Sequence, residues 1–95
     1  MLDTVYRQKE DVVTRRIAGE TLLVPIRARL ADMQRLFVIE GSGEFVWGRL
    51  DGRKSLREIR DALLADFDVP AARAENDIKR FVNQLREAGL VEEEL

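Results

Sequence analysis

The chain of 95 residues contains neither cysteine nor histidine. Without cysteine it has no disulfide, no thiolate metal site and no cysteine nucleophile. The absence of histidine removes the commonest metal ligand and the commonest general base near neutral pH. Carboxylates and lysine remain available for catalysis, but these two absences favour a binding function. We therefore expect no enzyme, no catalytic residue, no metal site and no cofactor.

Long apolar runs and an excess of one charge are also missing. No run of about 18 apolar residues occurs, and residues 1–10, MLDTVYRQKE, have no apolar stretch. The sequence therefore predicts no membrane span and no secretory signal, and we expect a cytoplasmic location. The 16 basic and 18 acidic residues give a net charge of -2, without the basic excess typical of polyanion-binding proteins. We expect neither a membrane nor a nucleic acid as partner.

Residues 12–24 have the pattern of a β-hairpin. Residues 12–17 are rich in β-branched side chains, and residues 21–24 form a second strand-like run. Gly19-Glu20 lies between them and predicts a two-residue turn, with glycine where a positive φ is needed. Pro25 ends the second strand because proline has no N–H to donate to a neighbouring strand.

Residues 35–39 are the strongest strand candidate. Leu36 and Val38 point to one face, and Phe37 and Ile39 point to the other, so both faces are apolar. This pattern is typical of a central strand that is covered on both sides. It also fits a strand with one covered face and one edge that awaits a partner. Both interpretations remain open at this point.

Three helices are predicted in the remainder of the chain. Ser42 is the expected N-cap of a short helix, and Ser55 with Glu58 has the spacing of a capping box for a second helix. The third helix is expected to start at Pro70 or Ala71 and to end at Gly89. Its apolar stripe consists of Ile78, Phe81, Val82 and Leu85.

Three strands followed by three helices predict an α+β domain with a three-stranded antiparallel sheet. We expect residues 1–95 to form a single domain. Residues 1–10 are expected to be flexible, and residues 92–95 are expected to form a solvated acidic tail.

No group of residues in the sequence has the pattern of a catalytic site. Ser42 lacks a base that would make it a nucleophile, and the glycines around it do not form a phosphate loop. A small DNA-binding winged helix is a second possibility, beside the function that the family resemblance described below implies. The polar face of the third helix, however, mixes basic residues with Glu75, Asp77 and Glu87, and each carboxylate would face a phosphate. A third possibility is a subunit that binds a folded protein through a broad apolar patch.

The middle of the chain resembles the PqqD-like family. The resemblance rests on Phe45-Val46-Trp47, on Leu50-Asp51-Gly52, on the helix start at Ser55 and on the helix end Phe67-Asp68-Val69. Leu22-Leu23-Val24-Pro25 and the closing Leu85, Gly89 and Leu90 extend it over residues 11–91. Two positions depart from the family pattern, because Glu40 replaces the usual Asn and Ser42 replaces the usual Thr.

The resemblance implies a winged-helix-like domain that binds the leader segment of a precursor peptide. The leader would add as a further strand beside the third strand and be presented to a modifying enzyme, often a radical enzyme in this family. An open strand edge supplies unpaired backbone donors and acceptors for such pairing. The expected pairing residues are Leu36, Phe37, Val38 and Ile39. A monomer and a strand-exchanged dimer are both compatible with an open edge.

The third helix is expected to form the other wall of the groove. Asp77, Phe81 and Gln84 lie along one flank of its apolar stripe, next to small alanine side chains. The opposite flank carries Glu75 and Lys79, whose long charged side chains would crowd a groove. We therefore favour the first flank. The alternative is that Phe81 belongs to the core and that Asp77 and Gln84 are merely solvated.

Overall fold

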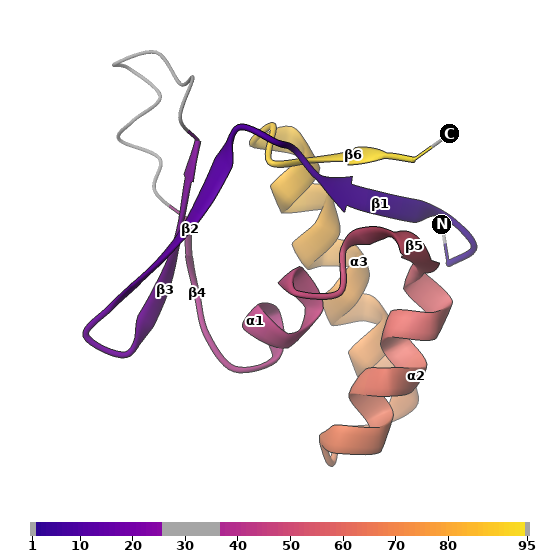
Figure 1. Ribbon diagram of the computed structural model, residues 1–95. Coiled ribbons are helices and arrows are strands. Elements are labelled where there is room, and N and C mark those ends of the chain that lie inside the picture. The colour runs from indigo at the N-terminus through magenta and orange to yellow at the C-terminus, as the bar shows by residue number, and fades with distance from the viewer. Residues whose placement is uncertain (1, 26–36, 95) are drawn as a thin grey trace.

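The computed structural model describes residues 2–25 and 37–94 (Figure 1). One antiparallel sheet, here called the wing sheet, has the order β2 (Val12–Ile17), β3 (Glu20–Pro25), β4 (Phe37–Ile39). A second antiparallel sheet, here called the terminal sheet, has the order β5 (Asp51–Ser55), β1 (Val5–Gln8), β6 (Val91–Glu93). The helices are α1 (Ser42–Trp47), α2 (Leu56–Asp66) and α3 (Ala71–Glu87). The predicted α+β class, with a three-stranded antiparallel sheet followed by three helices, is confirmed.

The wing sheet stands to one side of the helices, with α1 between it and α2 (Figure 1). The terminal sheet lies at the end of the molecule where α3 finishes. Side chains from both sheets and all three helices share one buried core, whose largest fully buried members are Tyr6, Leu23, Leu50, Leu56, Ile59, Ile78, Leu85, Leu90, Val82 and Val91. In the part of the chain that the structure describes, no helix is long and apolar enough to cross a membrane.

The terminal sheet was not predicted, and the expectation of a flexible N-terminus is wrong for Val5–Gln8. This segment forms β1 and pairs with β5 on one side and β6 on the other. Tyr6 is only 2% exposed, so the strand also contributes to the core. Its order comes from partners about 50 and 85 residues away in sequence, which is why local composition gave no sign of it.

The acidic C-terminal residues are not simply a solvated tail. Glu93 is the last residue of β6, and Glu92 and Glu94 both form ion pairs with Arg7 of β1. The backbone N–H of Glu94 also donates to the Val5 carbonyl oxygen at 2.8 Å. Leu90 and Val91, just before the acidic residues, fold back onto the core, and each is 2% exposed.

The hairpin turn lies one residue earlier than predicted. Ile17 pairs with Glu20, which leaves Ala18 and Gly19 as the two loop residues. Their φ angles are 53° and 82°, so both central residues have the positive φ of a type I′ turn. The predicted Gly19-Glu20 turn is therefore wrong in register, because glycine occupies the second central position and not the first.

The predicted capping box of α2 is confirmed, whereas the predicted cap of α1 is wrong. The Ser55 hydroxyl accepts from the Glu58 N–H at 3.2 Å, and the Glu58 carboxylate accepts from the Ser55 N–H at 3.1 Å. Ser42 is instead the first residue of α1, and Gly41 precedes it without a side-chain cap. In α3 the helix end at Gly89 is as expected, with a φ of 77°.

The Asp51-Gly52 corner joins α1 to the terminal sheet. The Asp51 carboxylate accepts from the backbone N–H of Arg53 and Lys54 and from the Lys54 ammonium at 2.9 Å. The hydrogen bond from Lys54 is the main reason that the pKa of Asp51 falls to about 2. Gly52 has a φ of 80°, and a Cβ there would lie 3.3 Å from the Arg7 Cβ.

Gly52→Ala is expected to destabilise the protein more than Gly19→Ala. Both glycines have a positive φ, which costs an alanine about 1 kcal/mol. Nothing lies within 4 Å of a Cβ at Gly19, whereas the Gly52 Cβ would press on β1. Urea unfolding should therefore give losses of about 1 kcal/mol for Gly19→Ala and about 2 kcal/mol for Gly52→Ala. Equal losses would contradict a close approach of β1 to this corner.

Asp51→Asn is expected to lower the free energy of unfolding by about 0.5–1 kcal/mol at pH 7. The effect is small because solvent screens the interactions of this exposed side chain. The pKa of Asp51 in the folded protein, about 2, lies below its usual value of 3.8. The stabilisation is therefore complete above about pH 4 and is lost as the pH falls through about 2. Urea unfolding of both proteins at pH 7 and pH 2 should show the difference shrinking, and a constant difference would contradict this account.

Candidate functional site

β4 is an edge strand of the wing sheet. Leu22 pairs with Val38 and Leu23 with Phe37 on one side, and no strand among the described residues pairs on the other side. Val38 is 51% exposed, while Ile39 on the opposite face is 4% exposed. Of the two interpretations left open by the sequence, the edge strand is therefore correct. Leu36, the fourth predicted pairing residue, lies outside the described residues.

The favoured flank of α3 carries Asp77, Phe81 and Gln84, as its periodicity predicts. Phe81 is half-buried and packs against the core, whereas Asp77 and Gln84 are exposed. The structure thus joins both interpretations of Phe81, since one side of its ring packs on the core and the rest remains accessible. Asp77 is 3.9 Å from the Arg73 guanidinium at the surface.

The opposite flank of α3 is occupied by its own ion pairs. The Glu75 carboxylate accepts from the Lys79 ammonium at 3.1 Å and lies 3.5 Å from the Arg60 guanidinium of α2. The hydrogen bond from Lys79 is the largest cause of the lowered pKa of Glu75. These side chains satisfy one another and cover α3 on this flank.

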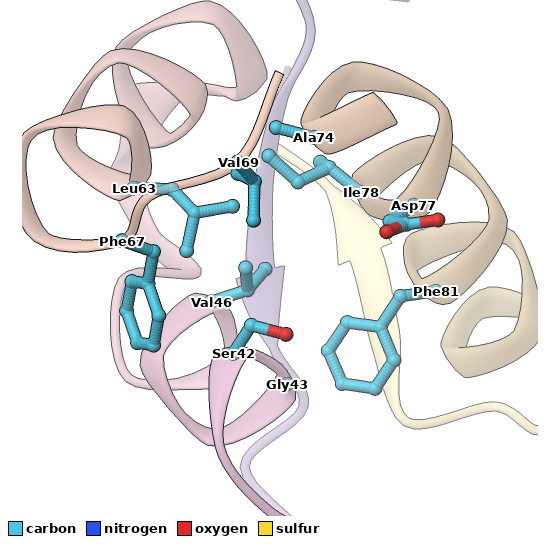
Figure 2. A pocket seen from close by; sticks show the side chains of 10 residues that line it. All are labelled: Ser42, Gly43, Val46, Leu63, Phe67, Val69, Ala74, Asp77, Ile78 and Phe81. Carbon is cyan, nitrogen blue, oxygen red and sulfur yellow. The ribbon is translucent and has the colours of Figure 1, made fainter. Parts of the chain in front are cut away.

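A cavity of about 170 Å³ opens between the three helices (Figure 2). Its wall is mostly apolar, and the polar groups are the Ser42 hydroxyl and the Asp77 carboxylate. Figure 2 shows Asp77 and Phe81 extending from α3 toward Ser42 and Gly43 of α1. The full lining is Ser42, Gly43, Val46, Leu63, Phe67, Val69, Ala74, Asp77, Ile78 and Phe81.

Most of these lining residues were not predicted as site residues. Ser42 was assigned to a helix cap, and Phe67 and Val69 to the end of the second helix. Their place in a cavity depends on the packing of three helices, which no local pattern reports.

Gly43 lies where the cavity meets β4 and α3. A Cβ at this position would be 3.6 Å from the Phe81 ring and 3.8 Å from the Ile39 Cβ. A second, shallower hollow is lined by Phe37 of β4 and by Gln84, Glu87 and Ala88 of α3. We call the space from this hollow past Phe81 to the helical cavity the groove.

The groove combines the β4 edge with a mostly apolar cavity whose polar groups are Ser42 and Asp77. One wall is the unpaired edge of β4, and the other is the Asp77–Phe81–Gln84 flank. Over residues 2–25 and 37–94, no group of three or more acidic side chains is arranged to hold a metal ion. An extended segment with alternate apolar side chains would match both walls.

A family model described as coenzyme PQQ synthesis protein D (PqqD) matches residues 20–91, well over half of the chain. The chain belongs to the PqqD family. The resemblance inferred from the motifs around Trp47 and Gly52 is therefore confirmed. No curated protein matches the chain.

Two solved structures share the fold of this PqqD-family chain. "TbiB1 in Complex with the TbiA(beta) Leader Peptide" is 26% identical, with a TM-score of 0.74 over 90% of this chain and 94% of that chain. "Lasso peptide synthetase B1 complexed with the leader peptide" is 18% identical, with a TM-score of 0.75 over 92% of this chain and 96% of that chain. At that lower identity, the second likeness supports the fold alone.

Gly43→Ala is expected to change the free energy of unfolding by no more than about 0.5 kcal/mol. The added methyl group would meet Phe81 and Ile39 at ordinary van der Waals distances, and its backbone is not in the positive-φ region. Urea unfolding measures this change directly. A loss above about 2 kcal/mol would show that α1 lies closer to Phe81 than the structure has it.

Proposed function

We propose that the chain is a non-catalytic adaptor that captures the leader segment of a precursor peptide and presents it to a modifying enzyme. The observation that carries this proposal is the edge of β4, which has no partner strand among the described residues and shares a hollow with Gln84 of α3. The structural neighbour that is 26% identical supports it, because that structure is a complex with a leader peptide.

The leader pairs its backbone with Phe37, Val38 and Ile39 and packs alternate side chains against Asp77, Phe81 and Gln84. Backbone pairing contributes affinity that is largely independent of sequence. An apolar side chain at one end of the leader enters the helical cavity and provides selectivity. Recognition is thereby separated from the chemistry, which acts on another part of the precursor.

The remaining parts of the proposal concern the setting of the adaptor. We propose a cytoplasmic, single-domain protein that acts as a monomer. Its partner is a separate modifying enzyme, and we propose a radical enzyme for this role. A strand-exchanged dimer would occupy the β4 edge and compete with the leader. DNA binding is disfavoured because Glu75 and Asp77, which pair with Lys79 and Arg73, interrupt the basic side chains on the surface of α3.

Val38→Pro is expected to weaken leader binding more than tenfold, because a proline ring and a missing N–H disrupt an added strand. The ligand is the synthetic, fluorescently labelled leader of a short precursor encoded near this gene, and fluorescence anisotropy measures its dissociation constant. Val38→Thr is the matched control, since it keeps the N–H and β-branching and should bind within about twofold of the parent. Labelled duplex DNA serves as a second ligand.

Peptide variants test strand pairing without any risk to the fold. Leaders N-methylated at single positions should lose binding at alternate residues, because only every second N–H of a strand points toward β4. Uniform tolerance of N-methylation, or salt-sensitive binding of DNA with no binding of several leaders, would contradict the proposal.

A further inference from the structure

The wing sheet is tied to the rest of the protein by two polar side-chain contacts. The Trp47 indole N–H donates to the Thr14 hydroxyl oxygen at 3.2 Å, and the Arg16 guanidinium lies 3.1 Å from the Glu44 carboxylate. Within the described ranges, no other side-chain hydrogen bond or ion pair joins the wing strands to the helices or to the terminal sheet. Both contacts link β2 to α1. We call these four residues the wing seat.

The wing seat lies on the inner face of the wing sheet. Thr14 pairs with Leu23, and Arg16 pairs with Thr21, so these side chains share the face that packs on the helices. The apolar contacts of Leu23 on this face are non-directional and allow the sheet to tilt. The buried Thr21 hydroxyl has no hydrogen-bond partner among the described residues and adds no directional tie. The hydrogen bond and the ion pair of the wing seat are therefore the directional side-chain contacts between this sheet and α1, and the ion pair is made by an Arg16 side chain that is 70% exposed.

α1 connects the wing seat to the groove. Glu44 and Trp47 are three residues apart and lie on one side of this helix. Ser42 and Val46, four residues apart, line the helical cavity on its other side. The same short helix therefore holds β2 with one side and forms a groove wall with the other.

Because the wing seat lies on β2, a change in its contacts would shift the position of the β4 edge. β2 and β4 are the two outer strands of the wing sheet, roughly 10 Å apart at the usual strand spacing. Tilting the sheet by about 10° around β2 would move the β4 edge by about 1.7 Å relative to α3. An added strand must pair with β4 and pack against α3 at the same time. A movement of this size would break either its hydrogen bonds to β4 or its contact with α3.

We infer that Thr14 and Arg16 are positioning residues that set the width of the groove through Trp47 and Glu44, although neither side chain lines the groove. This inference rests on the proposed function. The wing seat holds the β4 edge in the binding-competent position before the peptide arrives. Its loss lowers the competent fraction of the protein and raises the apparent dissociation constant in proportion.

Thr14→Val tests the hydrogen bond. It removes the acceptor and is expected to raise the dissociation constant of the labelled leader about three- to tenfold. Thr14→Ser keeps the acceptor and should bind within about twofold of the parent. Thr14 is exposed and lies outside the buried core, so all three proteins should still unfold in urea as a single cooperative transition. Equal affinity of Thr14→Val and the parent would overturn the inference.

A charge exchange tests the ion pair. Arg16→Glu should weaken leader binding, and the double variant Arg16→Glu with Glu44→Arg should restore much of the loss. Arg15→Glu is the matched control, because this substitution makes the same change of charge on the opposite face of β2. The inference fails if Arg15→Glu and Arg16→Glu weaken binding equally, or if the double variant shows no recovery.

Spectroscopy without peptide separates this inference from the proposed function. Trp47 is the only tryptophan, so its indole N–H gives a single NMR signal that reports the wing seat. Thr14→Val should shift this signal and the amide signals of Phe37, Val38 and Ile39, while those in the middle of α2 stay unchanged. If the parent protein binds no leader, the proposed function fails. The chemical-shift changes in the absence of peptide then decide whether the wing seat positions β4. Unchanged β4 signals would then overturn it.

Discussion

The backbone edge of β4, which no strand in the described part of the chain covers, is the constraint on which the proposed function depends. Backbone N–H and C=O groups are strong hydrogen-bonding groups, and a free strand edge is a template for another strand. Proteins usually protect such edges, because exposed ones invite aggregation. Here the described part of β4 is only three residues long, and its inner face is anchored by the buried Ile39. A short edge of this kind limits unspecific pairing but leaves room for one extended segment.

The helices give this edge its selectivity. α3 turns its ion-paired flank, with Glu75 and Lys79, away from the groove and leaves the flank with Asp77, Phe81 and Gln84 accessible. α1 closes the space between β4 and α3 at Gly43, where only a small residue allows so close an approach of the Phe81 ring. The cavity behind Gly43 then provides an apolar site that backbone pairing alone would lack. In the proposed function, edge, flank and cavity together account for specific binding of one peptide segment.

The sequence predicted the features that local chemistry determines. The capping box of Ser55 and Glu58, the end of α3 at Gly89 and the helical stripe of α3 depend on residues a few positions apart, and all three occur as predicted. The family resemblance was likewise visible in ordered local motifs. The turn at Ala18-Gly19 was misplaced by one residue because the register of β2 and β3, and not the glycine alone, decides which residues form the loop.

Features that depend on distant contacts were missed. β1 is ordered by Ser55 and Glu93, which are far away in sequence, and the helical cavity combines residues from three helices. Even the site residues that were predicted correctly in position, such as Phe81, could not be assigned to core or surface from the sequence. The wing seat is a further example, since nothing local links Thr14 to Trp47.

The central claim is that a leader peptide adds to the β4 edge opposite α3, and a backbone amide NMR titration with the leader tests it most directly. The account predicts shifts concentrated on Phe37, Val38 and Ile39, on the Asp77–Phe81–Gln84 flank and on Gly43. It also predicts that the β4 amides exchange more slowly with solvent once the peptide is bound. Saturable shifts confined to the terminal sheet or to the flank with Glu75 and Lys79, with β4 unchanged, would contradict it.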